Sequence, residues 1–319
     1  MKTVFIHAGT HKAGSTSLQH FLANASGILA DQGILYPKSG RPNQNFKGHH
    51  LLSWYLLGKN NIKTDESWKH LRDEIVSWKG DRVVISSEDL ETITVEQILR
   101  IQSYLAGCDL NVIIYLRNPF DFLVSVYKQL IKSGVYGGEF LNDFLPEKSW
   151  RADYGPLVDR WSKVLGPDKV HLRIFDKVKK KPGIERDFCS IIGVNADSIA
   201  CQIPTPTRAL NISPSNRKTA ILLRFNKLTW RIERPRRFGR TRKIRTVIIR
   251  KLRAVIRGDG TIGKGYIGKI MRLFLGIGVY SSLQEVKAIE YLRRSTLNDR
   301  HNAFLERYIE AEDHDFLKI

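Results

Sequence analysis

The beginning of the chain joins a short apolar run to a loop that contains two glycines. Residues 3–7 are expected to form a strand, and a helix is expected to begin near Ser15. The loop between them runs through Gly9, Lys12 and Gly14 and ends in three hydroxyl residues. A strand, a glycine loop and a helix start present backbone N–H groups and the positive end of a helix dipole to an anion. The sequence therefore predicts a phosphate-binding loop, and a tight turn without a ligand is the less favoured alternative.

The lysine of this loop stands in an unusual place. In a loop that binds a nucleoside triphosphate, the lysine directly follows the second glycine. Here Ser15 follows Gly14, and Lys12 lies two residues before that glycine. We therefore expect the loop to hold a phosphate in a different way from an ATPase.

Apolar runs alternate with helix-period segments along the first 200 residues, which indicates an α/β fold with a parallel sheet and crossover helices. The expected strands are residues 3–7, 33–37, 82–87, 112–116 and 169–175. The expected helices are residues 51–57, 67–78, 95–105, 119–133, 154–165, 188–192 and 219–228, the helix from Ser15, and terminal helices with a break near Ser295. Prolines 204 and 206 suggest a boundary between a core, residues 1–205, and a mainly helical region, residues 206–319, that packs on it.

Charge separates the same two parts of the chain. Residues 1–200 carry a net charge of +4, whereas residues 201–319 carry +16 out of the total of +20. Residues 231–257 hold twelve basic side chains and a single acid. This segment is expected to be an interfacial helix at a membrane, a groove for an acidic glycan, or a solvated basic helix that packs its apolar side on the core. Nucleic acid is less favoured because aromatic residues are not interleaved.

A second candidate anion site follows the apolar run 112–116. Arg117 ends that expected strand, and Ser125 lies eight residues later on a helical stripe with Lys128 that is expected to face away from the core. An arginine and a hydroxyl can hold a second phosphate. The alternative is an ordinary strand exit with a helix cap.

The two sites together resemble those of sulfotransferases. Residues 117–121, Arg-Asn-Pro-Phe-Asp, with Ser125 and Tyr127 resemble the 3′-phosphate motif of that family, and the loop 9–17 looks like its 5′-phosphosulfate loop. Residues 222–226 and 298–308 are similar to bacterial members. The resemblance implies a P-loop-like, three-layer fold and the donor 3′-phosphoadenosine 5′-phosphosulfate (PAPS), which leaves as 3′-phosphoadenosine 5′-phosphate.

The resemblance also implies roles for individual residues. Lys12 would stabilise the leaving group, and Arg117 with Ser125 would hold the 3′-phosphate. The transferred sulfuryl group bears less charge than a phosphoryl group, so no metal is expected. The residues expected to bind the donor are Gly9, Thr10, Lys12, Ala13, Gly14, Ser15, Thr16, Ser17, Arg117 and Ser125.

The acceptor needs a base, for which Glu88 is favoured because many carbohydrate sulfotransferases use a glutamate. His11 is a second candidate, and His49 and His50 are expected to line the acceptor cleft.

Two departures from the family favour its carbohydrate or bacterial branch. Ser17 replaces the aromatic residue that stacks on adenine in cytosolic members, and their Arg-Lys-Gly clamp has no clear match. The expected acceptor is a hydroxyl, less favourably an amine, of a glycan, glycolipid or capsule precursor.

The sequence also predicts where the protein is located and leaves two alternative functions open. The three cysteines form no CxxC pair, the sequence has no apolar run of 18 residues, and the first strand is expected to begin at about residue 2. These features predict a cytoplasmic protein. Peripheral contact at the inner membrane face is the alternative. A nucleotide kinase would need a lysine directly after Gly14. A non-catalytic membrane- or glycan-binding protein on the same fold is the second rival.

Overall fold

A computed structural model describes residues 1–200, 214–233 and 282–318. These residues form two compact units, each built from separate stretches of sequence. Among the described residues, the first comprises 1–119, 153–200 and 300–318, and the second comprises 120–152, 214–233 and 282–299. The boundary that the sequence suggested near residue 205 lies outside the described residues.

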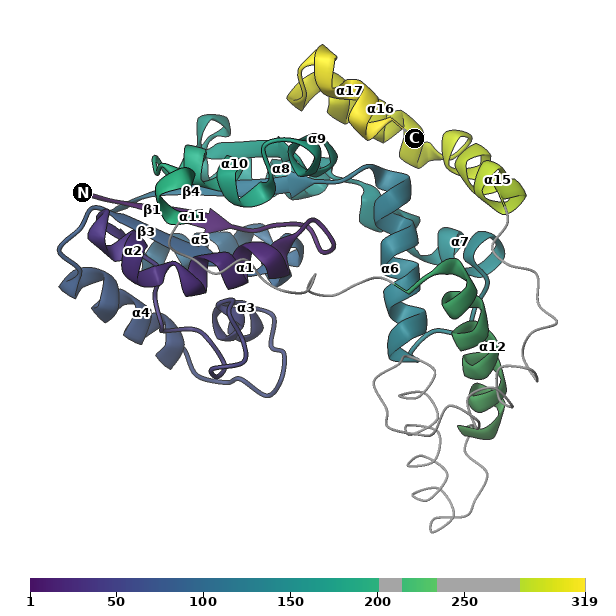
Figure 1. Cartoon of the computed structure of the whole chain (residues 1–319), viewed down its shortest axis with the longest axis horizontal. Coiled ribbons are helices and arrows are strands. Elements are labelled where there is room, and N and C mark those ends of the chain that lie inside the picture. The colour runs from purple at the N-terminus through teal and green to yellow at the C-terminus, as the bar shows by residue number, and fades with distance from the viewer. Residues whose placement is uncertain (201–213, 234–281, 319) are drawn as a thin grey trace, which may run out of the picture. The chain divides into compact units, whose positions relative to one another are not determined.

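The described residues of the first unit contain a five-stranded parallel sheet with the order β2-β3-β1-β4-β5 (Figure 1). This confirms the α/β fold class. The strands are β1 (Lys2–His7), β2 (Ile34–Leu35), β3 (Arg82–Ser86), β4 (Cys108–Leu116) and β5 (Val170–Ile174). Strand β4 begins four residues earlier than the sequence suggested, because its first residues pair with β1 from Lys2 onward.

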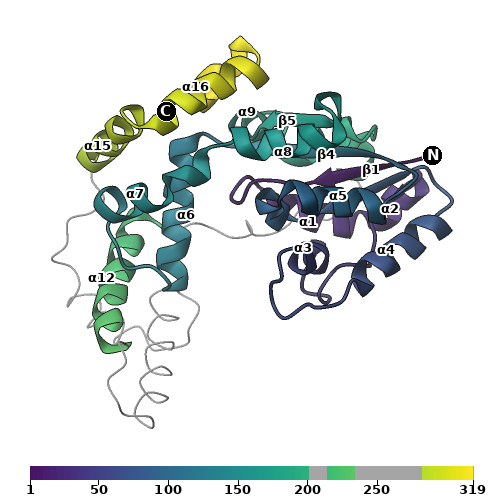
Figure 2. The same ribbon diagram turned by 180° about the vertical axis from the view of Figure 1, so that it is seen from behind.

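Helices cover both faces of this sheet. Val4 and Ile6 of β1 join one apolar cluster, and Phe5 joins the other, as expected for side chains that alternate along a strand. The helices packed against the Val4 face are α3 (His50–Leu56), α4 (Glu66–Ser77), α5 (Val95–Tyr104) and α8 (Gly155–Leu165). On the Phe5 face lie α1 (Ser15–Asn24), α2 (Ser26–Asp31), α9 (Phe175–Lys180), α10 (Ile184–Ile191) and α11 (Ala196–Ala200) (Figures 1 and 2). The result is the three-layer arrangement that the sequence predicted.

Short helical segments near the carboxyl ends of the strands complete the first unit. The 3₁₀ turn η1 (Glu88–Thr92) follows β3, and the last described residues add 300–308 of α16 (Thr296–Tyr308), η5 (Ala311–Asp313) and α17 (His314–Leu317). Phe304, Leu305 and Leu317 are buried in the same apolar cluster as Val4. The 3₁₀ turn η4 (Pro167–Lys169) precedes β5.

The second unit is helical in its described part. It contains nearly all of α6 (Pro119–Ser133), the π-helix η2 (Phe140–Phe144), α7 (Leu145–Lys148), η3 (Ser149–Ala152), α12 (Asn216–Glu233) and α15 (Ser282–Arg293), together with the first residues of α16. Leu123 of α6, Leu222 of α12 and Leu292 of α15 meet in one apolar cluster. The predicted break near Ser295 is confirmed, because α15 ends at Arg293 and α16 begins at Thr296.

A buried asparagine links two helices of this unit. The Asn226 side chain on α12 donates hydrogen bonds to the carbonyl oxygens of Ile131 and Tyr136, each at 2.9 Å. Ile131 lies in the last turn of α6, where carbonyl groups lack partners inside the helix. Asn226 therefore supplies donors that the end of α6 needs.

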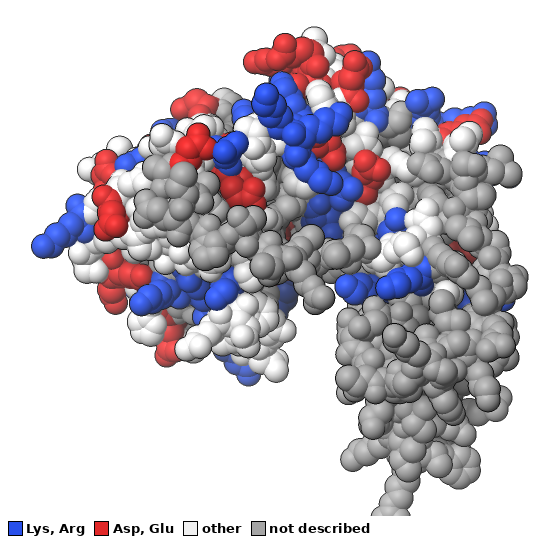
Figure 3. Space-filling model, in the orientation of Figure 1, with Lys and Arg blue, Asp and Glu red and all other residues white. Residues whose placement is uncertain are grey.

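The described surface of the first unit has an ordinary mixture of charges. Lys and Arg side chains are interspersed with Asp and Glu on the face drawn in Figure 3. The side chains of the basic segment 231–257 lie outside the described residues. Among the helices that are described, none combines the length and the apolar character that crossing a membrane requires.

Candidate active site

The loop predicted to bind phosphate lies where the strand order of the sheet reverses. Strand β1 is central, with β3 on one side and β4 on the other. Ligands of open parallel sheets bind at the carboxyl ends of the strands beside such a reversal. His7, Ser86 and Leu116 end these three strands, so the segments after them meet at one edge.

Two glycines of the loop are required by its close packing. A Cβ atom at Gly9 would overlap Nε2 of His7, which lies buried beneath the loop. A Cβ at Gly14 would lie 2.8 Å from the Phe175 ring, and the backbone there has a φ of +81°. Lys12 also has a positive φ, +70°, a conformation uncommon for residues other than glycine. The loop is therefore a tightly folded turn that places Lys12 in a strained backbone position.

A buried threonine fastens the loop to the sheet. The Thr10 hydroxyl donates to the carbonyl oxygen of Tyr115 in β4 at 2.7 Å. The backbone N–H of Ala13 donates to the carbonyl oxygen of Thr10 at 3.3 Å, which closes the turn. These bonds fix the loop relative to both β1 and β4.

The start of α1 has the features of an anion site. Its N-cap residue is Gly14, which has no side chain to cap the helix, and its first turn carries no acidic residue. The Ser15 hydroxyl is buried without a partner among the described residues. The positive end of the helix dipole and the buried Ser15 hydroxyl together favour a bound anion. Ser17 differs, because its hydroxyl donates to Glu185 Oε1 of α10 at 2.5 Å.

Arg117 lies against this loop. Its Nη1 donates to the carbonyl oxygen of Lys12 at 3.2 Å, and its Nε lies 4.0 Å from Asp176 Oδ1. Asp176 in turn accepts a hydrogen bond from the backbone N–H of Asn118 at 2.7 Å, and the Tyr154 hydroxyl donates to the Arg117 carbonyl at 2.8 Å. The first and second motifs of the sequence are therefore brought together through Lys12 and Arg117.

Ser125 is placed differently from the sequence expectation. It lies in α6, in the second unit, and its exposed fraction is 7%. The expectation that it faces away from the core is wrong. Leu123, Val126 and Tyr127 are also buried, so α6 is covered over more of its circumference than the single apolar stripe suggested.

Acidic side chains of η1 surround His11. The backbone N–H of His11 donates to Glu91 Oε2 at 2.7 Å, and its Nδ1 lies 3.2 Å from Glu91 Oε1. Burial alone would lower the pKa of His11, but the hydrogen bond and charge of Glu91, with the charges of Glu88 and Asp89, raise it. A raised pKa keeps more of this ring protonated near neutral pH, so it suits a cationic donor better than a base.

Glu88, the favoured base, is held by the helix that follows the loop. Its Oε2 accepts a hydrogen bond from Gln19 Nε2 of α1 at 2.7 Å. The Glu88 carboxylate is half-buried. The structure thus brings Glu88 to the loop edge of the sheet with one oxygen positioned by α1.

The histidine pair divides into two environments. His49 is buried, its Nδ1 accepts from the backbone N–H of Ser86 at 3.1 Å, and its Nε2 contacts the Pro37 carbonyl at 3.0 Å. Both ring nitrogens are therefore engaged with backbone, which leaves none for a ligand. Burial lowers the pKa of His49 to about 3.

The ring of His50 contacts other side chains instead of backbone groups. Its Nδ1 lies 3.3 Å from the Ser87 hydroxyl and 3.6 Å from Asp89 Oδ2, and its ring stacks on Trp54. Asp89 also accepts hydrogen bonds from Trp54 at 3.0 Å and Lys59 at 2.8 Å. Burial would raise the pKa of Asp89, but the bonds from His50 and Lys59 lower it.

Several residues of the site escaped the sequence analysis. Glu91 and Asp176 contact His11 and Asn118 from elements distant in sequence. His7 and Gln19 come from the strand and the helix that flank the loop. The position of His7 at the end of β1 was a usable signal, because that end faces the predicted loop. Among the described residues, no group of three or more His, Cys, Asp or Glu side chains is arranged to hold a metal ion.

Comparisons with known proteins give the following results. No family model and no curated protein matches this chain. Among solved structures, the chain is similar to a sulfotransferase from Alicyclobacillus acidocaldarius, with a TM-score of 0.42 and 20% identity over 74% of this chain and 97% of that one. It is also similar to the sulfotransferase domain from the curacin biosynthetic pathway, with a TM-score of 0.39 and 16% identity over 67% of this chain and 80% of that one. Both of these structures belong to the class that the sequence motifs resemble.

Proposed function

We propose that this protein is a sulfotransferase that takes the sulfuryl group of PAPS and transfers it to an acceptor hydroxyl. The observation that carries the proposal is the contact between Arg117 Nη1 and the Lys12 carbonyl at 3.2 Å. It brings the residue proposed for the 3′-phosphate of the donor against the loop proposed for the 5′-phosphate. A nucleotide with phosphates at both positions matches this pair of cationic residues better than one with a single phosphate chain.

The start of α1 supplies the proposed 5′-phosphate site. The positive end of its dipole and the Ser15 hydroxyl, which has no partner among the described residues, favour an anion, and Thr16 stands in the same turn. Lys12 would lie beside the oxygen that bridges phosphate and sulfate. The positive charge of Lys12 would stabilise the negative charge that develops on the leaving phosphate.

The proposed reaction is an in-line displacement. The acceptor oxygen attacks sulfur, the bond from sulfur to the bridging oxygen breaks, and 3′-phosphoadenosine 5′-phosphate leaves with that electron pair. The acceptor proton passes to a base, for which we propose Glu88, positioned by Gln19. His50 beside Asp89 is the second candidate, whereas the raised pKa of His11 favours a role in binding anionic groups.

The proposal also names a class of acceptor and a location of the protein in the cell. The two departures from the pattern of the cytosolic sulfotransferases, at Ser17 and at the Arg-Lys-Gly clamp, support a carbohydrate hydroxyl on a glycan, glycolipid or capsule precursor. The charge of residues 231–257 supports contact with an acidic glycan or an anionic membrane surface. We propose a cytoplasmic location with peripheral membrane contact through that segment.

Calorimetric titration tests the donor site. The full chain and its Arg117→Ala variant would be titrated with 3′-phosphoadenosine 5′-phosphate, ATP and AMP, and Arg100→Ala on the exposed side of α5 would serve as the control. We expect binding of the bisphosphate to be strongest and to weaken at least tenfold in Arg117→Ala only. Stronger binding of ATP would support a nucleotide kinase instead. Absence of binding by all three nucleotides would support the non-catalytic alternative.

A further inference from the structure

An exposed aromatic side chain lies in the loop between β2 and α3. Phe46 is 40% exposed, and among the described residues of the first unit no other phenylalanine, tyrosine or tryptophan is as exposed. Residues 43–45, Asn-Gln-Asn, precede it and are exposed as well. A ring flanked by side-chain amides combines apolar contact with groups that donate and accept hydrogen bonds.

Phe46 is part of a packed group of three rings. Its ring meets the rings of His50 and Trp54 edge to face, with centroids 5.8 and 6.0 Å apart. His50 and Trp54 stack with their centroids 5.6 Å apart, and the Trp54 indole N–H donates to Asp89 Oδ2 at 3.0 Å. The half-buried Trp54 is thereby held in one orientation, and Phe46 packs against it. The three rings therefore form a defined surface in place of a single projecting side chain.

Two separate contacts bring this aromatic group close to Glu88, the proposed base. On one side, Asp89 directly follows Glu88 in η1 and accepts the hydrogen bond from Trp54. On the other side, Gly48 of the same loop packs against Gln19, because a Cβ atom at Gly48 would lie 2.7 Å from the Gln19 amide. That amide donates to Glu88 Oε2 at 2.7 Å. The aromatic group and the proposed base therefore belong to one cluster of contacts.

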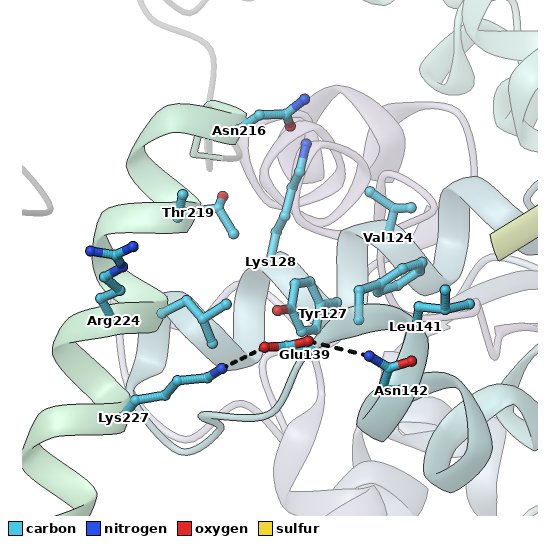
Figure 4. A pocket seen from close by; sticks show the side chains of 13 residues that line it. Val124, Tyr127, Lys128, Glu139, Leu141, Asn142, Asn216, Thr219, Arg224 and Lys227 are labelled. Atoms are coloured by element: carbon cyan, nitrogen blue, oxygen red, sulfur yellow. Dashed lines mark hydrogen bonds and ion pairs between the residues drawn. The ribbon is translucent and has the colours of Figure 1, made fainter. Parts of the chain in front are cut away.

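The second unit contains a cavity that is arranged differently. The cavity measures about 350 Å³, and its walls come from α6, the segment 139–142 and α12 (Figure 4). Among its described lining residues the one acid is Glu139, which is bonded to Lys227 at 2.9 Å and to Asn142 at 3.3 Å. The carboxylate of this cavity is thus engaged in its own wall. The aromatic group, by contrast, shares a compact unit with the residue proposed to take the acceptor proton.

We infer that Phe46 and Trp54 form the surface on which a pyranose ring of the acceptor stacks. The inference rests on the sulfotransferase function proposed above. The axial C–H groups of a pyranose form an apolar face, which loses its contact with water against an aromatic ring and is attracted by the negative face of that ring. The exposed amides of residues 43–45 supply hydrogen bonds to the sugar hydroxyls. A protein partner would cover about 800 Å² on this side, which is far more than one exposed ring and its neighbours offer.

Binding of simple glycosides tests the surface without sulfuryl transfer. The probes are the methyl β-glycosides of glucose, galactose and N-acetylglucosamine, each added to the full chain with and without 3′-phosphoadenosine 5′-phosphate. Saturation-transfer NMR measures the affinity and shows which sugar protons contact the protein. We expect at least one glycoside to bind through its ring C–H protons. Absence of binding by all three would overturn the inference.

Variants of Phe46 locate the binding. Phe46→Leu keeps an apolar side chain but removes the ring, and we expect it to weaken the bound glycoside about fivefold. Phe46→Trp keeps a ring and should restore the affinity. Trp150→Ala removes an aromatic side chain that is 60% exposed in the second unit, so it is the matched control and should change nothing. Circular dichroism verifies folding, and equal affinity of Phe46→Leu and the wild type would sink the assignment.

Kinetics with PAPS and the bound glycoside separate this inference from the proposed function. Phe46→Leu should raise the KM for the glycoside about fivefold and leave the KM for PAPS unchanged, because the ring contacts the acceptor alone. Transfer that is indifferent to Phe46→Leu would retain the sulfotransferase and refute the stacking surface. Glycoside binding that depends on Phe46 without any transfer would contradict the sulfotransferase and leave a sugar-binding surface.

Discussion

Lys12 combines a strained backbone with a charge at the phosphate loop. Its φ of +70° is stabilised by the bond from Arg117 to its carbonyl and by the turn that Thr10 closes. Strained positions persist where the surrounding structure over-determines them, and they cluster at functional sites. We therefore regard Lys12 as a residue whose side chain acts in the reaction and whose backbone is part of the loop.

Lys12→Ala should separate catalysis from binding. Removal of a group that stabilises the leaving phosphate is expected to lower kcat about 10²–10³-fold. The affinity for 3′-phosphoadenosine 5′-phosphate should change less, because Arg117 and the α1 amides remain. Steady-state kinetics and calorimetry on the same preparation measure the two effects. Unchanged kcat would remove Lys12 from the proposed mechanism.

Thr10→Val tests how firmly the loop is attached to the sheet. The substitution keeps the shape but leaves the buried Tyr115 carbonyl without its 2.7 Å hydrogen bond. We expect a loss of about 1–3 kcal/mol in the free energy of unfolding, measured in urea. Thr92→Val, at an exposed hydroxyl of η1, is the control and should stay within about 0.5 kcal/mol of the wild type.

At the scale of elements, one asparagine of α12 donates hydrogen bonds to carbonyl groups at and beyond the end of α6. Asn226 occupies a helical position where an apolar residue would pack equally well, but its amide satisfies two carbonyl groups near the end of α6. Buried hydrogen-bonding networks of this kind fix which helices pair and in what register.

Asn226→Leu should destabilise the second unit. Two carbonyl groups would lose their donor, which is expected to cost about 2–4 kcal/mol, although the leucine adds apolar surface. Denaturation followed by the near-ultraviolet signal measures the loss. Lys218→Met on the same helix should leave stability unchanged, and an equally stable Asn226→Leu protein would contradict the role given to the amide.

The elements themselves were largely predictable from the sequence. Strand β1, the loop and α1 follow from an apolar run, two glycines and a helical period, all within 25 residues. The short helices α2 and α9 escaped because six residues are too few for a clear period. The burial of Ser125 escaped for another reason: it depends on packing around most of α6, which residues distant in sequence decide.

Side-chain partners within the site were less predictable than the site itself. The two motifs predicted that Lys12 and Arg117 carry the anion chemistry, and the structure brings Arg117 Nη1 within 3.2 Å of the Lys12 carbonyl. His49 looked available from sequence because it stands in a polar stretch, whereas its ring bonds to Ser86 and Pro37. Such partners come from tertiary structure, and no local pattern encodes them.

At the scale of the whole molecule, buried histidines make stability depend on pH. Burial lowers the pKa of both His7 and His49 to about 3, so the folded protein keeps them neutral where the unfolded chain, with a pKa near 6.5, takes up protons. Between these values the unfolded state binds more protons, and stability therefore falls as pH falls. Each histidine contributes a slope of about 1.4 kcal/mol per pH unit at most.

Urea unfolding at pH 7.0, 6.0 and 5.0 measures this dependence. His11, whose pKa is raised, acts in the opposite direction, so the comparison must use variants. His49→Asn should unfold more easily at pH 7 but should lose less stability than the wild type between pH 6 and 5. A parallel pH dependence of the two proteins would show that His49 is charged in the folded state.

The division of the first unit among three stretches of sequence has a consequence for synthesis. Phe304, Leu305 and Leu317 pack into its core, yet a ribosome makes them more than a hundred residues after the last strand of the sheet. A growing chain can pair β1 through β5 once residue 174 has emerged, but the face of the sheet that holds Val4 stays partly uncovered until the last described helices arrive. The nascent protein therefore carries an exposed apolar surface between the synthesis of β5 and that of α16 and α17, and holdase chaperones that bind such surfaces are expected to act on it in that interval.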